Sequence, residues 1–376
     1  MKKAMILVID GCAPSYLTEQ NAPNLFRLAR ERGFWKTVLG AMPSVTNVNH
    51  ACILSGKWPE ETGVTGNYFY DPRTGREGFI EERGYMKAET ILQRYQKAGE
   101  KTALLTVKGK ILGVYGEGVS FGLSLQDPDR ELLARYRLPD PPAVDSPEAT
   151  GWIMDAAYRC LQRDCPALIY CTTNDFIFHH FAPGSKEADG QIAAIDQAVQ
   201  KIASLDPERQ IYITADHGMN QKTVIVNFQK IAKRAGFDVY CLPPLKDRYI
   251  ENHVYQEGGM LYVFVRRPDQ RQAFYAFAQG NQFVEEILTK KEAAQRFHLP
   301  TGQIGDYVLL APWETAFGEP EEEILHTQAS RTHGSLYERE APLIALNPQR
   351  EADAYQYSKD IALCLLGRGG PTVGLV

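Results

Sequence analysis

The sequence predicts an α/β protein: a mostly parallel sheet with helices on both faces, plus a smaller α+β insertion. The first apolar run, residues 4–10, is short and continuous, as expected for a strand that is buried on both faces. Strand-like and helix-like stretches then alternate, which favours a parallel sheet covered by helices. With 376 residues, the chain is also long for one simple core.

The elements of the predicted core follow one another in regular order. Asn21 and Pro23 begin a helix that ends at Gly33. Three helix–strand pairs come next, at 88–98 and 102–107, 148–163 and 167–171, and 187–203 and 210–214. A strand at 342–347 and a helix at 354–366 close the chain. In such folds ligands bind at the carboxyl ends of the strands.

The alternation breaks in the second half of the chain. We expect a catalytic core of residues 1–225 and 325–376, and an insertion of residues 226–324 that caps the active site. The insertion should contain helices at 226–235, 268–278 and 290–298, and strands at 260–266, 283–288 and 306–311. We expect a loop at 319–328 to return the chain to the core, and the Pro-rich 138–147 to be a surface connection.

Composition and charge exclude several classes of protein. A net charge of −5, without a basic stripe that carries aromatics, argues against a nucleic-acid polymer as partner. Seven scattered cysteines without a CxxC motif predict reduced thiols in the cytoplasm. The first apolar run ends at Asp10, too early for a signal peptide, and no stretch reaches membrane-spanning length. We expect a cytoplasmic protein that binds no membrane; a homodimer is an open possibility.

Aspartate and histidine residues follow the ends of several predicted strands. Asp10 comes directly after the first strand, and Asp175 lies just past strand 167–171. His179 is four residues beyond Asp175, a spacing that puts both side chains on one face of a helical turn. The other members of the set are Asp216 and His217, after strand 210–214, and His333, just before the last strand. All six should converge at one edge of the sheet.

Three aspartates and three histidines are too many ligands for one tetrahedral zinc, but they suit two adjacent metal ions. Each residue alone has a plainer explanation, because an aspartate at a strand end often caps a helix and a single histidine often lies on the surface. Their joint placement at strand ends favours the metal site.

Thr46 is the candidate nucleophile. It precedes a helix of about ten residues that ends at Gly56, so its hydroxyl lies at a helix N-terminus. Free N–H groups and partial positive charge at that end suit a phosphate oxyanion. The alternative is that Thr46 only caps the helix.

Taken in chain order, these residues resemble the two-zinc branch of the alkaline phosphatase superfamily, which contains nucleotide pyrophosphatases/phosphodiesterases and phosphonoacetate hydrolase. The resemblance covers residues 4–225 and about 325 to the end. It implies two Zn²⁺ per chain. One would be held by Asp175, His179 and His333, and the other by Asp10, Asp216, His217 and the Thr46 oxygen.

Finer motifs are similar to those of phosphonoacetate hydrolase. The stretch GNYFYD implies that Asn67 contacts a phosphoryl oxygen, together with the N–H of Asn47. TVKGK implies that Lys108 and Lys110 hold a substrate carboxylate. The two lysines are two residues apart, so in an extended chain their side chains should face the same side. The alternative is that both are surface lysines at the start of a helix. The pair Asn49-His50 instead resembles the Asn-His pair that phosphodiesterases have at this position.

The resemblance implies a hydrolase that cleaves the C–P bond of phosphonoacetate to acetate and phosphate through a phosphorylated Thr46. Its partner would be a small anionic, phosphorus-containing substrate. The alternatives are a phosphodiesterase that acts on nucleotides and, from another class, a non-catalytic metal-binding protein. A sulfatase would need C-x-P-x-R, and Tyr16 stands at the arginine position after Cys12. The role of His180 is open.

Overall fold

The central sheet of the computed structural model, which describes residues 2–248 and 253–367, has seven strands in the order β2-β16-β8-β1-β7-β5-β6. The strands are β1 (Ala4–Val8), β2 (Gly33–Leu39), β5 (Thr102–Thr106), β6 (Phe121–Ser124), β7 (Leu168–Thr172), β8 (Gln210–Thr214) and β16 (Glu340–Leu346). β16 runs antiparallel to both of its neighbours, and the other strands are parallel to one another. The predicted fold class, a mostly parallel α/β sheet, is confirmed.

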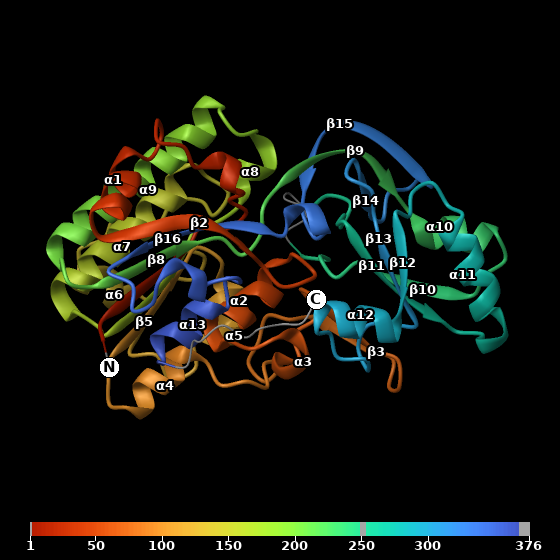
Figure 1. Cartoon of the computed structure of the whole chain (residues 1–376), viewed down its shortest axis with the longest axis horizontal. Coiled ribbons are helices and arrows are strands. Elements are labelled where there is room, and N and C mark those ends of the chain that lie inside the picture. The colour runs from red at the N-terminus through yellow and green to blue at the C-terminus, as the bar shows by residue number, and fades with distance from the viewer. Residues whose placement is uncertain (1, 249–252, 368–376) are drawn as a thin grey trace.

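Helices cover both faces of this sheet (Figure 1). α1 (Pro23–Arg32), α7 (Glu148–Asp164) and α9 (Lys186–Leu205) lie together on one face. α2 (Thr46–Ser55), α4 (Ile91–Lys97) and α13 (Asp360–Leu365) lie on the other. The remaining helices of this lobe are α3 (Pro59–Thr62), α5 (Gly109–Tyr115), α6 (Arg130–Tyr136) and α8 (Phe176–His180). Because β1 is enclosed on both sides, all five of its residues are buried, as its unbroken apolar sequence requires.

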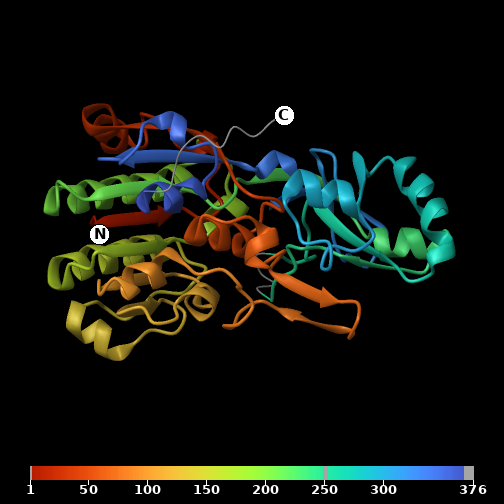
Figure 2. The same ribbon diagram turned by 60° about the horizontal axis from the view of Figure 1, so that its bottom comes forward.

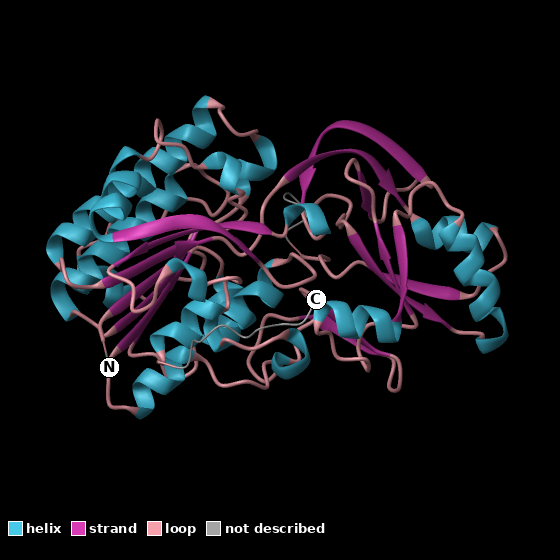
Figure 3. Ribbon diagram, viewed as in Figure 1, coloured by secondary structure: helices cyan, strands magenta, loops and turns pink. Residues whose placement is uncertain are grey.

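A second lobe is built on a four-stranded antiparallel sheet in the order β10-β11-β13-β12 (Figure 3). Its strands are β10 (Val239–Leu242), β11 (Met260–Val265), β12 (Glu286–Thr289) and β13 (Tyr307–Leu310). α10 (Phe228–Arg234) and α11 (Arg271–Gln279) pack on one face, and α12 (Lys290–Phe297) packs on the other. Because side chains alternate between the two faces of each strand, the sheet contributes to two separate apolar clusters, one on each face.

A three-stranded sheet joins the lobes and corrects one prediction. β9 (Asn220–Val226) lies between β14 (Thr315–Phe317) and β15 (Ile324–Thr332). The predicted loop at 319–328 is therefore wrong from Ile324 onward. The sequence of β15 is mostly polar and lacks the alternation typical of a strand. Its pairing with β9 also has a register shift between His326 and Ser330. The strand forms because it pairs with β9, about a hundred residues earlier in the chain.

Several short elements also differ from the sequence-based expectations. The edge strands β2 and β6 and a hairpin of β3 (Tyr68–Asp71) and β4 (Arg76–Phe79) were not predicted. Figure 2 shows this hairpin reaching from the core toward the second lobe, where Tyr68 and Tyr70 pack against the four-stranded sheet. The last helix begins at Asp360 rather than 354, because the Asp360 carboxylate accepts the N–H groups of Gln356 and Tyr357 and fixes a turn there.

Within the described ranges, none of the helices combines the length and the apolar character that crossing a membrane requires.

Candidate active site

Four of the predicted residues meet where β1 and β8 end, and we call Asp10, Asp216, His217 and Thr46 the threonine-side group. β1 and β8 are parallel neighbours, so residues just past their carboxyl ends meet. His217 Nε2 lies 3.5 Å from Asp10 Oδ1, 3.3 Å from Asp216 Oδ2 and 3.4 Å from Thr46 Oγ1. All four side chains are buried. The predicted convergence is present.

Gly11 allows this close approach of chain segments. Its N–H donates to Asp216 Oδ1 at 3.1 Å, and its φ of +73° is a conformation that glycine adopts without strain. A Cβ at this position would lie 3.0 Å from the Cβ of Asp175.

Thr46 is the first residue of α2, and Val45 takes the N-cap position. The hypothesis that Thr46 merely caps the helix therefore does not hold. Its hydroxyl instead faces His217 Nε2, and only 2% of the residue is exposed. A hydroxyl at the head of a buried ten-residue helix, beside two carboxylates, is well placed for a nucleophile once a cation is bound there.

A second group, which we call the insertion-side group, consists of Asp175, His179, His253 and His333. Asp175 precedes α8 and His179 lies on it, so Nε2 of the imidazole comes to 3.2 Å from Asp175 Oδ2. His333 lies between β15 and β16. Because β16 is antiparallel, its amino-terminal end shares an edge with the carboxyl ends of its parallel neighbours. The His333 ring stacks on that of His217, with centroids 3.5 Å apart, so the two groups are in contact.

His253 was not predicted. It comes from the segment between β10 and β11, and its ring centroid is 4.5 Å from that of His179 and 5.4 Å from that of His333. One ligand atom from each of the four insertion-side residues lies within 4.8 Å of the others. Since His253 follows no strand end and sits in no periodic pattern, the sequence carried no signal for it.

His50 is a further buried imidazole beside the threonine-side group. It lies on α2, and its Nδ1 is 2.6 Å from the hydroxyl of Tyr170. Its Nε2 is 3.9 Å from Asp216 Oδ2, which is beyond hydrogen-bonding distance. Among the described residues, His50 Nε2 is buried without a hydrogen-bond partner, and one ligand atom of His50 lies within 4.8 Å of ligand atoms of Asp10 and Asp216.

The electrostatics of the threonine-side group and of His333 suit bound cations. Burial, with Asp175 and Asp216 nearby, raises the pKa of Asp10 to about 7, and burial also raises the pKa of Asp216 to about 6. Burial lowers the pKa of His217 and, more strongly, of His333, so both imidazoles are neutral near pH 7. Neutral imidazole is the form that binds metals, and a nearby cation favours ionised carboxylates.

Several buried ligand atoms support the same conclusion. Among the described residues, Asp10 Oδ1, Asp216 Oδ2 and His333 Nε2 are buried without a hydrogen-bond partner. Unpartnered polar atoms are costly to bury, so their convergence calls for a binding partner. The aspartate and histidine donors match what divalent zinc-like ions prefer. The residues present fit two metal ions.

The two lysines are not in extended chain, as the sequence-based prediction assumed. Lys108 takes the N-cap position of α5 and Lys110 lies in the first turn of this helix. Lys108 Nζ is 2.8 Å from Asp10 Oδ2 and 2.7 Å from Asp175 Oδ1, whereas Lys110 pairs with Asp247. Both are buried beside the site, so they are not surface lysines that merely open a helix. Burial would lower the pKa of Lys108, but Asp10 and Asp175 raise it.

Asn67 is buried next to the head of α2. Its Oδ1 accepts the N–H of Asn47 at 3.0 Å, and its Nδ2 is 3.4 Å from the Leu245 carbonyl. The N–H of Asn47 is therefore already engaged, which corrects the expectation that it donates to substrate. Asn67 can still offer its amide N–H₂ to a ligand, because the contact to Leu245 is long.

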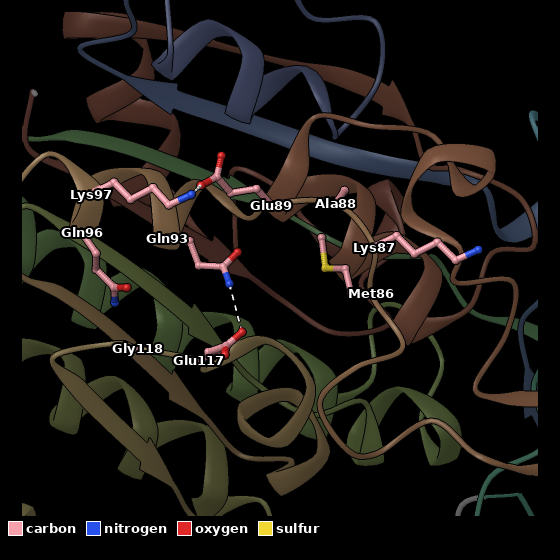
Figure 4. A pocket seen from close by; sticks show the side chains of 9 residues that line it. All are labelled: Met86, Lys87, Ala88, Glu89, Gln93, Gln96, Lys97, Glu117 and Gly118. Atoms are coloured by element: carbon pink, nitrogen blue, oxygen red, sulfur yellow. Dashed lines mark hydrogen bonds and ion pairs between the residues drawn. The ribbon is translucent and has the colours of Figure 1, made fainter.

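A surface pocket of about 530 Å³ lies away from both groups, beside α4 (Figure 4). Two side-chain pairs line it: Gln93 donates to Glu117 at 3.2 Å, and Lys97 pairs with Glu89 at 2.5 Å. This pocket holds none of the predicted site residues, so the buried edge of the central sheet is the candidate active site.

Known proteins resemble the chain along most of its length. It matches a crystal structure of phosphonoacetate hydrolase from Sinorhizobium meliloti in complex with phosphonoacetate, with 27% identity, a TM-score of 0.85, and coverage of 96% of this chain and 94% of that one. Murine ectonucleotide pyrophosphatase/phosphodiesterase 5 has the same fold, with 15% identity, a TM-score of 0.69, and coverage of 98% and 95%.

Curated relatives are longer than this chain. A pyrophosphatase/phosphodiesterase of Schizosaccharomyces pombe is 24% identical over 57% of this chain and 44% of its own length. Ectonucleotide pyrophosphatase/phosphodiesterase family member 7 of Mus musculus is 24% identical over 61% of this chain and 54% of its own length. The family model for type I phosphodiesterase/nucleotide pyrophosphatase matches residues 4–336. The resemblance drawn from the motifs is thereby confirmed, and the chain belongs to the type I phosphodiesterase/nucleotide pyrophosphatase family.

Proposed function

We propose that this protein is a zinc-dependent hydrolase that cleaves the C–P bond of phosphonoacetate to acetate and phosphate. The observation that carries the proposal is the presence of two buried lysines, Lys108 and Lys110, beside two groups of metal-type ligands and a threonine hydroxyl. A phosphonate that also carries a carboxylate has one anionic end for the metals and another for the lysines. The similarity to a phosphonoacetate hydrolase supports this choice.

In this proposal, Asp10, Asp216 and His217 hold one zinc ion next to Thr46, and Asp175, His179 and His333 hold the other. Bound zinc would lower the pKa of the threonine hydroxyl and neutralise charge on the phosphoryl oxygens. Asn67 donates a hydrogen bond to one of those oxygens. Lys108, within 3 Å of both Asp10 and Asp175, is the cation that can turn to the substrate when the carboxylates bind metal.

The reaction runs in two steps with Thr46 as nucleophile. The Thr46 hydroxyl gives up its proton to solvent, its oxygen forms a bond to phosphorus as the C–P bond breaks, and the bonding electron pair leaves with the methylene carbon. That carbanion is stabilised as an enolate by cations at its carboxylate and takes up a proton to give acetate. Water then cleaves the bond between Thr46 Oγ and phosphorus, which releases phosphate and restores the hydroxyl.

The alternative is a type I phosphodiesterase that acts on nucleotides or other phosphate diesters. Membership in that family and the presence of His50 favour it. Asp247 also favours it, because this carboxylate already pairs with Lys110 and would compete with the carboxylate of phosphonoacetate. A phosphodiester leaves Lys110 paired with Asp247 and needs no second anion site.

A turnover panel tests the proposal. Zinc-loaded protein is assayed with phosphonoacetate, with 4-nitrophenyl phosphate mono- and diesters, and with nucleotides, and Thr46→Ala serves as the inactive control. We expect kcat/KM to be highest for phosphonoacetate. Higher values for a diester or nucleotide would replace the phosphonate proposal with the phosphodiesterase one. Zinc binding without turnover of any substrate would indicate a non-catalytic metal-binding protein. A cytoplasmic location remains a prediction.

A further inference from the structure

His253 is the one member of the insertion-side group that comes from the insertion rather than from the core, and it is 4% exposed. We propose that His253 is a fourth protein ligand of the metal ion held by Asp175, His179 and His333. The inference rests on the proposed function, since it requires that a metal ion binds there.

The hydrogen bonds of two imidazoles, those of His179 and His333, support a shared ligand position. His179 Nδ1 is 2.7 Å from the Arg331 carbonyl, which leaves Nε2 toward Asp175. His333 Nδ1 is 2.8 Å from the Ser44 carbonyl. A backbone carbonyl on one ring nitrogen is the usual support for a histidine that binds metal through the other.

Two imidazoles of this group each have a ring nitrogen without a hydrogen-bond partner among the described residues. Within the described residues, His253 Nδ1 and His333 Nε2 are both buried and lack a hydrogen-bond partner. One ligand atom from each of His179, His253, His333 and Asp175 lies within 4.8 Å of the other three. One carboxylate and three imidazoles make a four-ligand set for a zinc ion, which would become five-coordinate when a phosphoryl oxygen binds.

A fourth ligand from the insertion would make the two metal sites unequal. The threonine-side group is supplied entirely by the core, at β1, α2 and β8. The insertion-side group would hold its ion with residues from both lobes, so metal binding at that site ties the insertion to the core. The fold thus predicts tighter ligation at the insertion-side group than three protein ligands would give.

Metal affinity in His253→Ala tests the inference without relying on activity. The competition of a chelator for Zn²⁺ is measured for the wild type, His253→Ala and His180→Ala. His180 is the matched control because it neighbours His179 but is exposed, with its Nδ1 on the Phe176 carbonyl. We expect His253→Ala to weaken one of two sites about 100-fold or more, since losing a residue that only supports a ligand already costs about 10–100-fold. His180→Ala should match the wild type.

His253→Cys provides a spectroscopic test with Co²⁺ in place of Zn²⁺. A thiolate at position 253 should bind Co²⁺ and produce a sulfur-to-cobalt charge-transfer band that the wild type lacks. In His253→Ala, added imidazole should restore part of the lost affinity. A purely structural role for His253 would give neither result.

The outcomes separate this inference from the proposed function. Wild-type affinities in His253→Ala, or no charge-transfer band in a folded, Co²⁺-loaded His253→Cys, would overturn the ligand role of His253. Unchanged metal affinity with a raised KM for phosphonoacetate would also overturn it and make His253 a substrate contact. A wild-type protein that binds no metal would instead refute the proposed function.

Discussion

The two ligand groups contact each other through the stacked rings of His217 and His333, yet they are built in different ways. The threonine-side group comes from strand ends and the first turn of a helix in the central lobe, and Gly11 N–H donates to Asp216 at 3.1 Å. The insertion-side group combines α8, the segment after β15 and the segment between β10 and β11. One site is therefore a product of the parallel sheet, and the other depends on how two lobes meet.

The largest expected effect is on the threonine-side group. Thr46→Ala should lower kcat for the best substrate by about 10³-fold or more, because it removes the proposed nucleophile. Thr46→Ser should keep part of the activity, since it retains the oxygen. Zinc content of the insertion-side group should not change in either variant. Near-normal turnover by Thr46→Ala would end the covalent mechanism.

Single ligand changes should empty one group and spare the other. Asp216→Asn should lose the threonine-side metal, and His333→Ala should lose the insertion-side metal, because each removes a ligand of one ion only. Elemental analysis after gel filtration should give about one zinc per chain for each variant and about two for the wild type. Two ions retained in either variant would contradict the ligand assignment.

Substitution of Lys108 or Lys110 should affect the turnover of phosphonoacetate and of phosphate esters differently. Replacing Lys108 or Lys110 with Met should lower phosphonoacetate turnover about 10–1000-fold, as expected for losing a charge-assisted contact of 1.5–3 kcal/mol or somewhat more. Cleavage of a 4-nitrophenyl ester should change much less. Equal losses on both substrates, or none on either, would remove the carboxylate role and favour the phosphodiesterase. Asp247→Asn should raise the affinity for phosphonoacetate if Asp247 competes for Lys110.

The smallest effect concerns Gly11, which lies between the groups. Gly11→Ala should reduce the free energy of unfolding by about 1–2 kcal/mol or more, because φ is +73° and a Cβ would press on Asp175. Gly184→Ala is the matched control: φ is +80°, and no described atom outside its chain neighbours lies within 4 Å of the added Cβ. Urea unfolding of the metal-free proteins measures both. A loss at Gly11 no larger than at Gly184 would show that contact with Asp175 costs nothing.

Sequence patterns predicted the threonine-side group well because its aspartates can be recognised from their position directly after a strand. Asp10 and Asp216 each follow an apolar run directly, and parallel strands bring such positions to one edge. His333 was predicted from its position just before the last strand of the core. His253 and the pairing of Lys110 with Asp247 could not be predicted, since both depend on where the insertion packs. β15 was missed for a similar reason: its strand conformation depends on pairing with the distant β9.

Anomalous diffraction at the zinc edge from zinc-loaded crystals tests the central claim most directly. We predict two peaks per chain, one among Asp10, Asp216, His217 and Thr46, and one among Asp175, His179 and His333. Lys108 should then have left its present contacts with Asp10 and Asp175. A single peak, or two peaks with Lys108 still bonded to both carboxylates, would contradict a two-metal active site built from these residues.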